Sequence, residues 1–258
     1  MRNRNSYIVT AKQADKNHIQ PFVTVVLLGE NYGYRMKSQG PTPLIPIQNK
    51  KTVLELQVNA IKSIFANYEI ILCSGFDTKK VSQFVKTRLA KENIRIVENQ
   101  VHYNSNSCES LRLALNNTCN DKVLVLSGDL IFNQKYLKAF DYKKTSVVLQ
   151  NDDSNKQFEI SVLSNGTHVN SMCLGEKDNF WTEGVFLADQ KSVSKAYEIV
   201  SNIEYKNKFI FEAMNELSKT VQIKAINTVD RTAVKVNNLK ILKNIRSYRE
   251  NINTKLFK

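Results

Sequence analysis

The chain has 258 residues, of which 42% are hydrophobic, and carries a formal net charge of +13. This length supports one large domain or two small ones, and no apolar stretch is long enough to span a bilayer as a helix. The charge suits a nucleic-acid or anionic-surface partner, but there is no Arg-rich tract and no basic run interleaved with aromatics. We favour a general compositional bias and expect no specific nucleic-acid partner.

Four cysteines, at positions 73, 108, 119 and 173, form no C-x-x-C pair and no metal-ligand spacing. We expect reduced, mostly buried thiols without a disulfide. The basic residues at the start of the sequence are not followed by the apolar core of a signal peptide. These features predict a cytoplasmic protein.

The first half of the chain alternates between strand and helix patterns. Residues 1–20 are polar and aperiodic and are expected to form an arm. A continuous apolar run at 22–28 is typical of a strand buried on both faces. Thr52 and Glu55 match a capping box and predict the start of a helix. Further expected elements are strands at 69–73, 94–97 and 123–126, and helices around 81–89 and 111–115.

This alternation predicts a doubly wound, mostly parallel α/β sheet. Ligands of such sheets bind outside the carboxyl ends of the strands. The loop after the first strand and Asp129, which follows the strand at 123–126, both fall at such ends. Within that loop, Gly33 could let the backbone approach a phosphate and Arg35 could bind its oxygens. For these two residues alone, an ordinary surface turn is the better explanation.

The second half has shorter strands and predicts a short mixed or antiparallel extension, so the sheet as a whole is expected to be mixed, mostly parallel. The expected strands are 146–149, 158–163, 169–172 and 221–226, and the expected helices are 190–200 and 209–217. From Val236, the apolar residues Leu239, Leu242 and Ile245 recur at helical spacing and predict an amphipathic, basic terminal helix that packs on the domain. The domain plan is therefore an arm (1–20), a main domain (21–235) and a terminal helix (236–258).

The order of these motifs resembles the nucleotidyltransferases of the sugar-phosphate and choline-phosphate type, from about residue 22 to 235. Residues 31–36 (Asn-Tyr-Gly-Tyr-Arg-Met) are similar to the family's G-x-G-x-R-[ML], and residues 41–44 (Pro-Thr-Pro-Leu) to its P-K-P-L turn. Gly128-Asp129 occupies the place of its first metal-binding aspartate. Residues 106–111 and 227–230 (Asn-Thr-Val-Asp) are similar to motifs of the choline-phosphate branch.

The resemblance implies a Rossmann-like, GT-A-like fold and a reaction. The phosphate of a small molecule attacks the α-phosphate of a nucleoside triphosphate, and pyrophosphate leaves. Asp129 and Asp230 would bind Mg²⁺, the expected cofactor, and CTP is the preferred nucleotide because the choline-phosphate motifs match. The second substrate would be phosphocholine-like or a sugar phosphate.

The same resemblance assigns roles to individual residues. The implied catalytic residues are Arg35, Lys37, Asp129 and Asp230. The implied nucleotide-binding residues are Leu28, Gly29, Asn31, Gly33, Tyr34, Arg35, Thr42, Gly75, Asn106 and Ser110. The implied residues for the second substrate are Lys177, Trp181 and Glu183.

Two departures from the family pattern keep other functions open. Asn31 replaces the first glycine of the loop, and Thr42 replaces the lysine that helps to neutralise the reacting phosphates. A nucleotide-binding or regulatory protein that has lost catalysis is therefore one alternative. A GT-A glycosyltransferase is another, although Asp152-Asp153 lacks the flanking strand of a D-x-D motif. The sequence leaves the oligomeric state open, including a homodimer.

Overall fold

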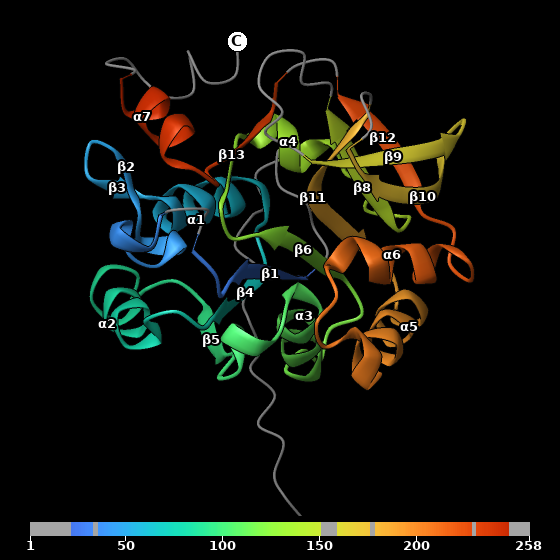
Figure 1. Ribbon diagram of the computed structural model, residues 1–258, viewed down its shortest axis with the longest axis horizontal. Coiled ribbons are helices and arrows are strands. Elements are labelled where there is room, and N and C mark those ends of the chain that lie inside the picture. Colours follow the sequence, from blue (N-terminus) through green and yellow to red (C-terminus); the bar gives the residue numbers. More distant parts are fainter. Residues whose placement is uncertain (1–21, 33–35, 151–158, 176–178, 229–230, 248–258) are drawn as a thin grey trace, which may run out of the picture.

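The computed structural model describes residues 22–32, 36–150, 159–175, 179–228 and 231–247. Its main feature is a nine-stranded sheet in the order β5-β4-β1-β6-β11-β8-β12-β10-β9. Helices cover both faces of this sheet (Figure 1). The predicted arm at 1–20 lies outside the described residues.

The first half of the sheet is parallel, as the sequence predicts. β1 (Val23–Gly29) lies between β4 (Tyr68–Ser74) and β6 (Val123–Ser127), and β5 (Ile94–Glu98) follows β4. Most side chains of β1, β4 and β6 are buried, because helices lie on either side of the sheet. Continuous apolar runs in the sequence therefore mark these strands correctly.

The second half of the sheet is antiparallel to a larger extent than predicted. β11 (Phe180–Leu187) pairs antiparallel with both β6 and β8 (Ser146–Gln150). β12 (Lys224–Thr228) runs parallel to β8, and β10 (His168–Leu174) and β9 (Ile160–Asn165) continue antiparallel. β9 also pairs with β11, so these five strands close into a ring.

The sheet is mixed, as expected, but it is not mostly parallel. Its second half is a closed ring of five strands with mainly antiparallel pairing, where a short extension was expected. The error comes from β11, for which the apolar pattern gave no separate strand prediction. This central strand reverses direction between β6 and β8 and sets the antiparallel character of the second half.

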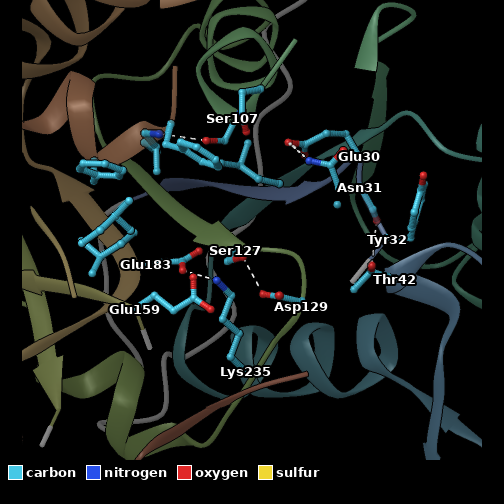
Figure 2. A pocket seen from close by; sticks show the side chains of 18 residues that line it. Glu30, Asn31, Tyr32, Thr42, Ser107, Ser127, Asp129, Glu159, Glu183 and Lys235 are labelled. Carbon is cyan, nitrogen blue, oxygen red and sulfur yellow. Dashed lines mark hydrogen bonds and ion pairs between the residues drawn. The ribbon is translucent and has the colours of Figure 1, made fainter. Parts of the chain in front are cut away.

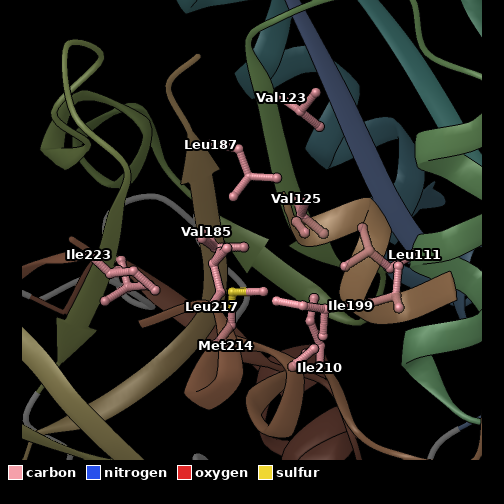
Figure 3. Close-up of a cluster of buried hydrophobic side chains, with 14 of the residues drawn as sticks. Leu111, Val123, Val125, Val185, Leu187, Ile199, Ile210, Met214, Leu217 and Ile223 are labelled. Atoms are coloured by element: carbon pink, nitrogen blue, oxygen red, sulfur yellow. The ribbon is translucent and has the colours of Figure 1, made fainter. Parts of the chain in front are cut away.

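One face of the sheet is covered by α3 (Ser107–Asn116), α5 (Gln190–Ser201) and α6 (Ile210–Ser218). Leu111, Ile199 and Met214 from these helices meet Val125 and Val185 from the sheet in one buried cluster (Figure 3). The other face packs against α1 (Val53–Ile64), α2 (Thr78–Arg88) and α4 (Gln134–Ala139).

The start of α1 follows the predicted capping box. The Thr52 hydroxyl accepts a hydrogen bond from the Glu55 amide (3.2 Å), and the Thr52 amide donates to the Glu55 carboxylate (2.9 Å). All four cysteines are free, and two of them, Cys73 and Cys108, are buried. None of the helices in the described part is long and apolar enough to cross a membrane.

Short elements complete the chain. β7 (Leu130–Phe132) pairs with β13 (Ala233–Lys235), and β2 (Pro46–Gln48) pairs with β3 (Lys51–Thr52). The 3-10 helices are η1 (Lys37–Gln39), η2 (Thr42–Leu44), η3 (His102–Asn104) and η4 (Ile203–Tyr205).

Of the predicted terminal helix at 236–258, the structure describes residues up to 247, and there α7 (Leu239–Ser247) packs on the domain. Residues 248–258 lie outside the described part. Leu242 and Ile245 are buried in a cluster with Val234 and Ile47, and Leu239 packs against the same cluster. Arg246 donates two hydrogen bonds to the carbonyl oxygen of Pro46 (2.8 and 3.0 Å). Residues 236–247 are thus part of the folded domain.

We expect Leu242→Ala to lower the free energy of unfolding by about 2–5 kcal/mol, because it leaves a cavity in this cluster. Lys243→Ala, one residue along on the exposed side of α7, should change it by less than about 0.5 kcal/mol. Urea unfolding followed by circular dichroism measures both values. Equal stability of the two variants would mean that the helix does not contribute to the core.

Candidate functional site

A pocket of about 290 Å³ opens at the carboxyl ends of β1 and β6 (Figure 2). Loops after these strands, the starts of α3 and α6, and parts of β9, β10, β11 and β13 form its walls. It is lined by Leu28, Gly29, Glu30, Asn31, Tyr32, Thr42, Asn106, Ser107, Ser127, Asp129, Glu159, Ile160, Leu174, Glu183, Phe209, Ile210, Phe211 and Lys235.

Asp129 is positioned by a close crossing of two strands. The Gly128 amide donates to the carbonyl oxygen of Leu28 (2.8 Å). A Cβ atom at Gly128 would lie 2.5 Å from the Gly29 Cα, which leaves no room for a side chain. The glycine therefore lets the turn after β6 pass directly over the end of β1, and the next residue, Asp129, reaches the pocket.

Hydrogen bonds from two side chains, Ser127 and Gln57, fix this turn. The Ser127 hydroxyl donates to the Asp129 carboxylate at 2.7 Å. The buried amide of Gln57, on α1, donates to the carbonyl oxygens of Ser127 (3.2 Å) and Leu130 (2.8 Å). Backbone on both sides of Asp129 is thus held by one side chain from the helix beneath it.

Thr42 has a structural role in the opposite wall. Its hydroxyl donates to the carbonyl oxygen of Asn31 at 2.8 Å, and the residue is almost completely buried. This bond joins η2 to the loop that follows β1. Thr42 therefore shapes the loop but brings no positive charge to the pocket.

Glu183 enters the pocket from an irregularity in β11. The pairing of β11 with β8 shifts register between Trp181 and Val185, and Glu183 has a positive φ of 56°. This backbone conformation costs a residue other than glycine roughly 1 kcal/mol. The irregularity directs the Glu183 carboxylate toward Lys235 of β13, with which it forms an ion pair (Figure 2). Strain of this kind tends to occur at functional sites.

The charges around this ion pair interact strongly. Burial disfavours the charged form of Lys235, but the attraction of Glu183, Asp129 and Glu159 outweighs burial and raises the Lys235 pKa above its ordinary value. Lys235 therefore stays protonated at neutral pH. Burial raises the pKa of Glu183, Lys235 lowers it, and the Asp129 charge raises it further.

Glu30 is a second unusual carboxyl group in the pocket wall. Burial raises its pKa to about 7. Hydrogen bonds from its own backbone amide and from Ser110 lower the pKa but do not outweigh burial, and the Asp129 charge adds a smaller increase. One of its carboxyl oxygens has no hydrogen-bond partner among the described residues. Near neutral pH, this group can therefore be protonated and donate a hydrogen bond.

The raised pKa of Glu30 predicts that pH changes stability. The unfolded carboxyl releases its proton near pH 4.5, whereas the folded one keeps it to about pH 7. Between these values the folded state binds more protons, so the contribution of Glu30 to stability falls as the pH rises. Glu30→Gln does not titrate and therefore removes this loss. Relative to the wild type, it should stabilise the metal-free protein by up to about 3 kcal/mol more at pH 8 than at pH 4.5. Urea unfolding at both pH values measures the difference, and a pH-independent effect would contradict the assignment.

Seven of the residues assigned from the sequence line the pocket together: Leu28, Gly29, Asn31, Thr42, Asn106, Asp129 and Glu183. Asn106 also caps α3, because its side chain accepts a hydrogen bond from the Ser107 amide (2.9 Å). Five other assigned residues lie outside the described part of the chain: Gly33, Tyr34, Arg35, Lys177 and Asp230.

Four assigned residues are described but do not line the pocket. Trp181 is fully buried and its indole N–H donates to the Gly184 carbonyl oxygen (2.8 Å), which corrects its assignment to substrate binding. Ser110 is buried and accepts a hydrogen bond from Asn99. The His102 ring fills the space beside Gly75. The ammonium of Lys37 lies 5.8 Å from the ring centre of Tyr32.

The sequence reasoning missed Glu30, Glu159, Lys235 and the aromatic residues at the start of α6. Glu30 had a usable signal, because it directly follows a buried strand. Lys235 had a weaker one: it follows the apolar residues Ala233 and Val234, so strand alternation could have placed it on the face opposite Val234. Its proximity to Asp129 depends on the pairing of β13 with β7 and could not be read from the sequence.

No protein-family model matches the chain, and no curated protein matches it. Solved structures do. The inositol-1-phosphate CTP transferase from T. maritima superposes with a TM-score of 0.70 at 13% identity, covering 88% of this chain and 96% of that one. The CTP:phosphocholine cytidylyltransferase from Streptococcus pneumoniae gives 0.71 at 15%, covering 88% and 99%. A putative glucose-1-phosphate thymidylyltransferase from Bacillus anthracis gives 0.70 at 15%, covering 90% and 99%.

The chain has the nucleotidyltransferase fold. At these identities the likeness concerns the fold, and it extends over nearly the whole length of each of these three structures. The resemblance inferred from the sequence motifs is confirmed at this level.

Proposed function

We propose that this protein is a Mg²⁺-dependent nucleotidyltransferase. It would join a nucleoside triphosphate to a phosphorylated small molecule and release pyrophosphate. The observation that carries the proposal is the placement of Asp129, which is held at the end of β6 in a pocket that also receives the loop after β1. Ligands of α/β sheets bind at such strand ends.

The proposed reaction needs no catalytic base from the protein. The attacking group is a phosphate oxygen that is already anionic, so no side chain needs to remove a proton. The new bond joins this oxygen to the α-phosphorus, and the bond from the α-phosphorus to the pyrophosphate breaks. Catalysis then consists of holding both substrates in line and offsetting their negative charge.

The pocket offers carboxylates for the metal. Mg²⁺ prefers one or two carboxylates together with phosphate oxygens and water, and Asp129 supplies one such ligand. Among the described residues, no three acidic, histidine or cysteine side chains are grouped so that they could hold a metal ion. When bound, the ion would neutralise phosphate charge and orient the triphosphate.

The second expected ligand, Asp230, lies outside the described residues. Two described residues close to it in the sequence, Thr228 and Thr232, are attached to the end of β8. The Thr228 hydroxyl donates to the Leu149 carbonyl oxygen (3.0 Å), and the Thr232 amide donates to the Gln150 side chain (2.9 Å). We keep Asp230 as the proposed partner of Asp129.

The chemistry of the pocket favours a cationic second substrate. Ile160, Leu174, Phe209 and Phe211 give one part of the lining an apolar and aromatic character, and Glu159 adds a carboxylate. A quaternary ammonium group suits aromatic and acidic surroundings, whereas sugar hydroxyls need several neutral polar partners. Phosphocholine is therefore the proposed second substrate. CTP is the proposed nucleotide because residues 106–111 and 227–230 resemble motifs of the choline-phosphate branch.

One observation favours a different function of the same fold. Thr42 brings no charge to the wall of the pocket, which suits a protein that binds a nucleotide without catalysing its transfer.

The cytoplasmic location and a homodimer stay predictions.

A pyrophosphate-release screen tests the proposal. Each of the four nucleoside triphosphates is combined with phosphocholine or glucose 1-phosphate in the presence of Mg²⁺, and we expect the highest rate with CTP and phosphocholine. Asp129→Asn should lower that rate at least about 100-fold, because it removes charge while keeping shape. Asp121→Asn, at the exposed opposite end of β6, is the matched control and should leave the rate unchanged.

Two results would count against the proposal. Triphosphate binding by calorimetry without pyrophosphate release from any pair would favour the non-catalytic alternative. Full activity of a folded Asp129→Asn variant would remove Asp129 from the site.

A further inference from the structure

We infer that Lys235 supplies the positive charge that contacts the phosphate oxygens of the substrates. This inference rests on the proposed function, because it requires anionic substrates in the pocket. It assigns a catalytic role to a residue that the sequence motifs did not indicate.

The charges that line the pocket single out Lys235. Among the lining residues that the structure describes, the acidic side chains are Glu30, Asp129, Glu159 and Glu183, and the sole basic side chain is Lys235. A triphosphate and a second phosphate would add further negative charge. Thr42 cannot offset it, because its hydroxyl already donates to Asn31. Lys235 is thus the one cation of the described lining that can approach the phosphates.

The backbone of Lys235 lies beside that of Asp129. β13 pairs antiparallel with β7, and Lys235 lies opposite Leu130, the residue after Asp129. The Val236 amide donates to the Asp129 carbonyl oxygen at 2.8 Å. The backbone of the lysine is therefore tied to the backbone that carries the proposed metal ligand, and a phosphate bound near one side chain is within reach of the other.

Lys235 is fixed in position within the pocket. Val234 is buried in the cluster under α7, so strand alternation turns Lys235 to the pocket side. The Glu183 carboxylate forms an ion pair with its ammonium, which lies between Glu159 and Asp129 in the view of Figure 2. Only 17% of the Lys235 side chain is exposed. An ammonium has three N–H donors, so an ion pair with one carboxylate leaves capacity for a phosphate oxygen.

The chemistry of this role is balanced without a proton transfer. Lys235 stays protonated while the bond from the attacking phosphate oxygen to the α-phosphorus forms and the bond to pyrophosphate breaks. Its N–H groups stabilise the charge that accumulates on the phosphate oxygens in the transition state.

A set of charge variants tests the inference. Lys235→Met alone leaves Glu183 buried without its partner, which can destabilise the fold. The double variant Glu183→Gln/Lys235→Met removes both charges and keeps the shape, and Glu183→Gln alone keeps the lysine. The control Asp141→Asn/Lys224→Met removes another lysine–carboxylate pair (3.0 Å) away from the pocket. Thermal melting checks that each variant is folded.

Two quantities are measured: the affinity for CTP with Mg²⁺, by calorimetry, and the rate of pyrophosphate release with phosphocholine. We expect both Lys235→Met and the double variant to lose at least about tenfold in affinity and about 100-fold or more in rate. Glu183→Gln should lose less in both, and the control double variant should match the wild type.

The outcomes separate this inference from the proposed function. If the double variant regains the affinity and rate of Glu183→Gln, Lys235 is only the counter-ion of Glu183 and the inference is wrong. If the wild type binds CTP but releases no pyrophosphate, the proposed transfer fails, while the affinities of the variants still decide the role of Lys235. If the wild type binds none of the four triphosphates, both are wrong.

Discussion

The site depends on how closely β1 and β6 approach each other at their carboxyl ends. Gly128 lies against the backbone of Leu28 and Gly29, where no side chain fits. This contact sets where the turn after β6 leaves the sheet, and so where Asp129 lies. The same turn provides β7, on which β13 pairs and brings Lys235 to the pocket. One glycine contact therefore positions both an acidic and a basic group.

Burial affects the protonation of the carboxyl groups in the pocket as much as ion pairing does. Glu30 is surrounded by protein and has a pKa near neutrality, whereas Glu183 is matched by a lysine. A buried carboxylate without a partner is unstable, so it either takes up a proton or acquires a cation. In this cavity, Glu30 can take up a proton near neutral pH, whereas Glu183 is paired with a cation. Phosphate and metal binding would change both balances, because each brings several charges into the cavity.

Local sequence signals predicted much of the parallel half of the fold. The capping box at Thr52 and the apolar runs of β1, β4 and β6 depend on neighbouring residues, and the structure has these elements where the patterns place them. Asp129 and Asn106 were found because motifs at strand and helix ends are also local. β11 was missed because its position depends on long-range pairing with β6 and β8. Lys235 was missed for the same reason, since only the pairing of β13 with β7 brings it to Asp129.

The closed ring of strands has a consequence for how the sheet ends. An exposed edge strand offers unpaired backbone groups to other chains and invites aggregation. At one end of this sheet, β9 turns back to pair with β11 through Ser161 and Phe180, which shortens the exposed edge there. The other end is β5, whose exposed positions carry Arg95 and Glu98. Arg95 donates to the carbonyl oxygen of Asn117 and binds Glu69 on the neighbouring strand β4. Closure thus shortens one margin of the sheet, while the other margin ends in a short strand whose exposed positions are charged.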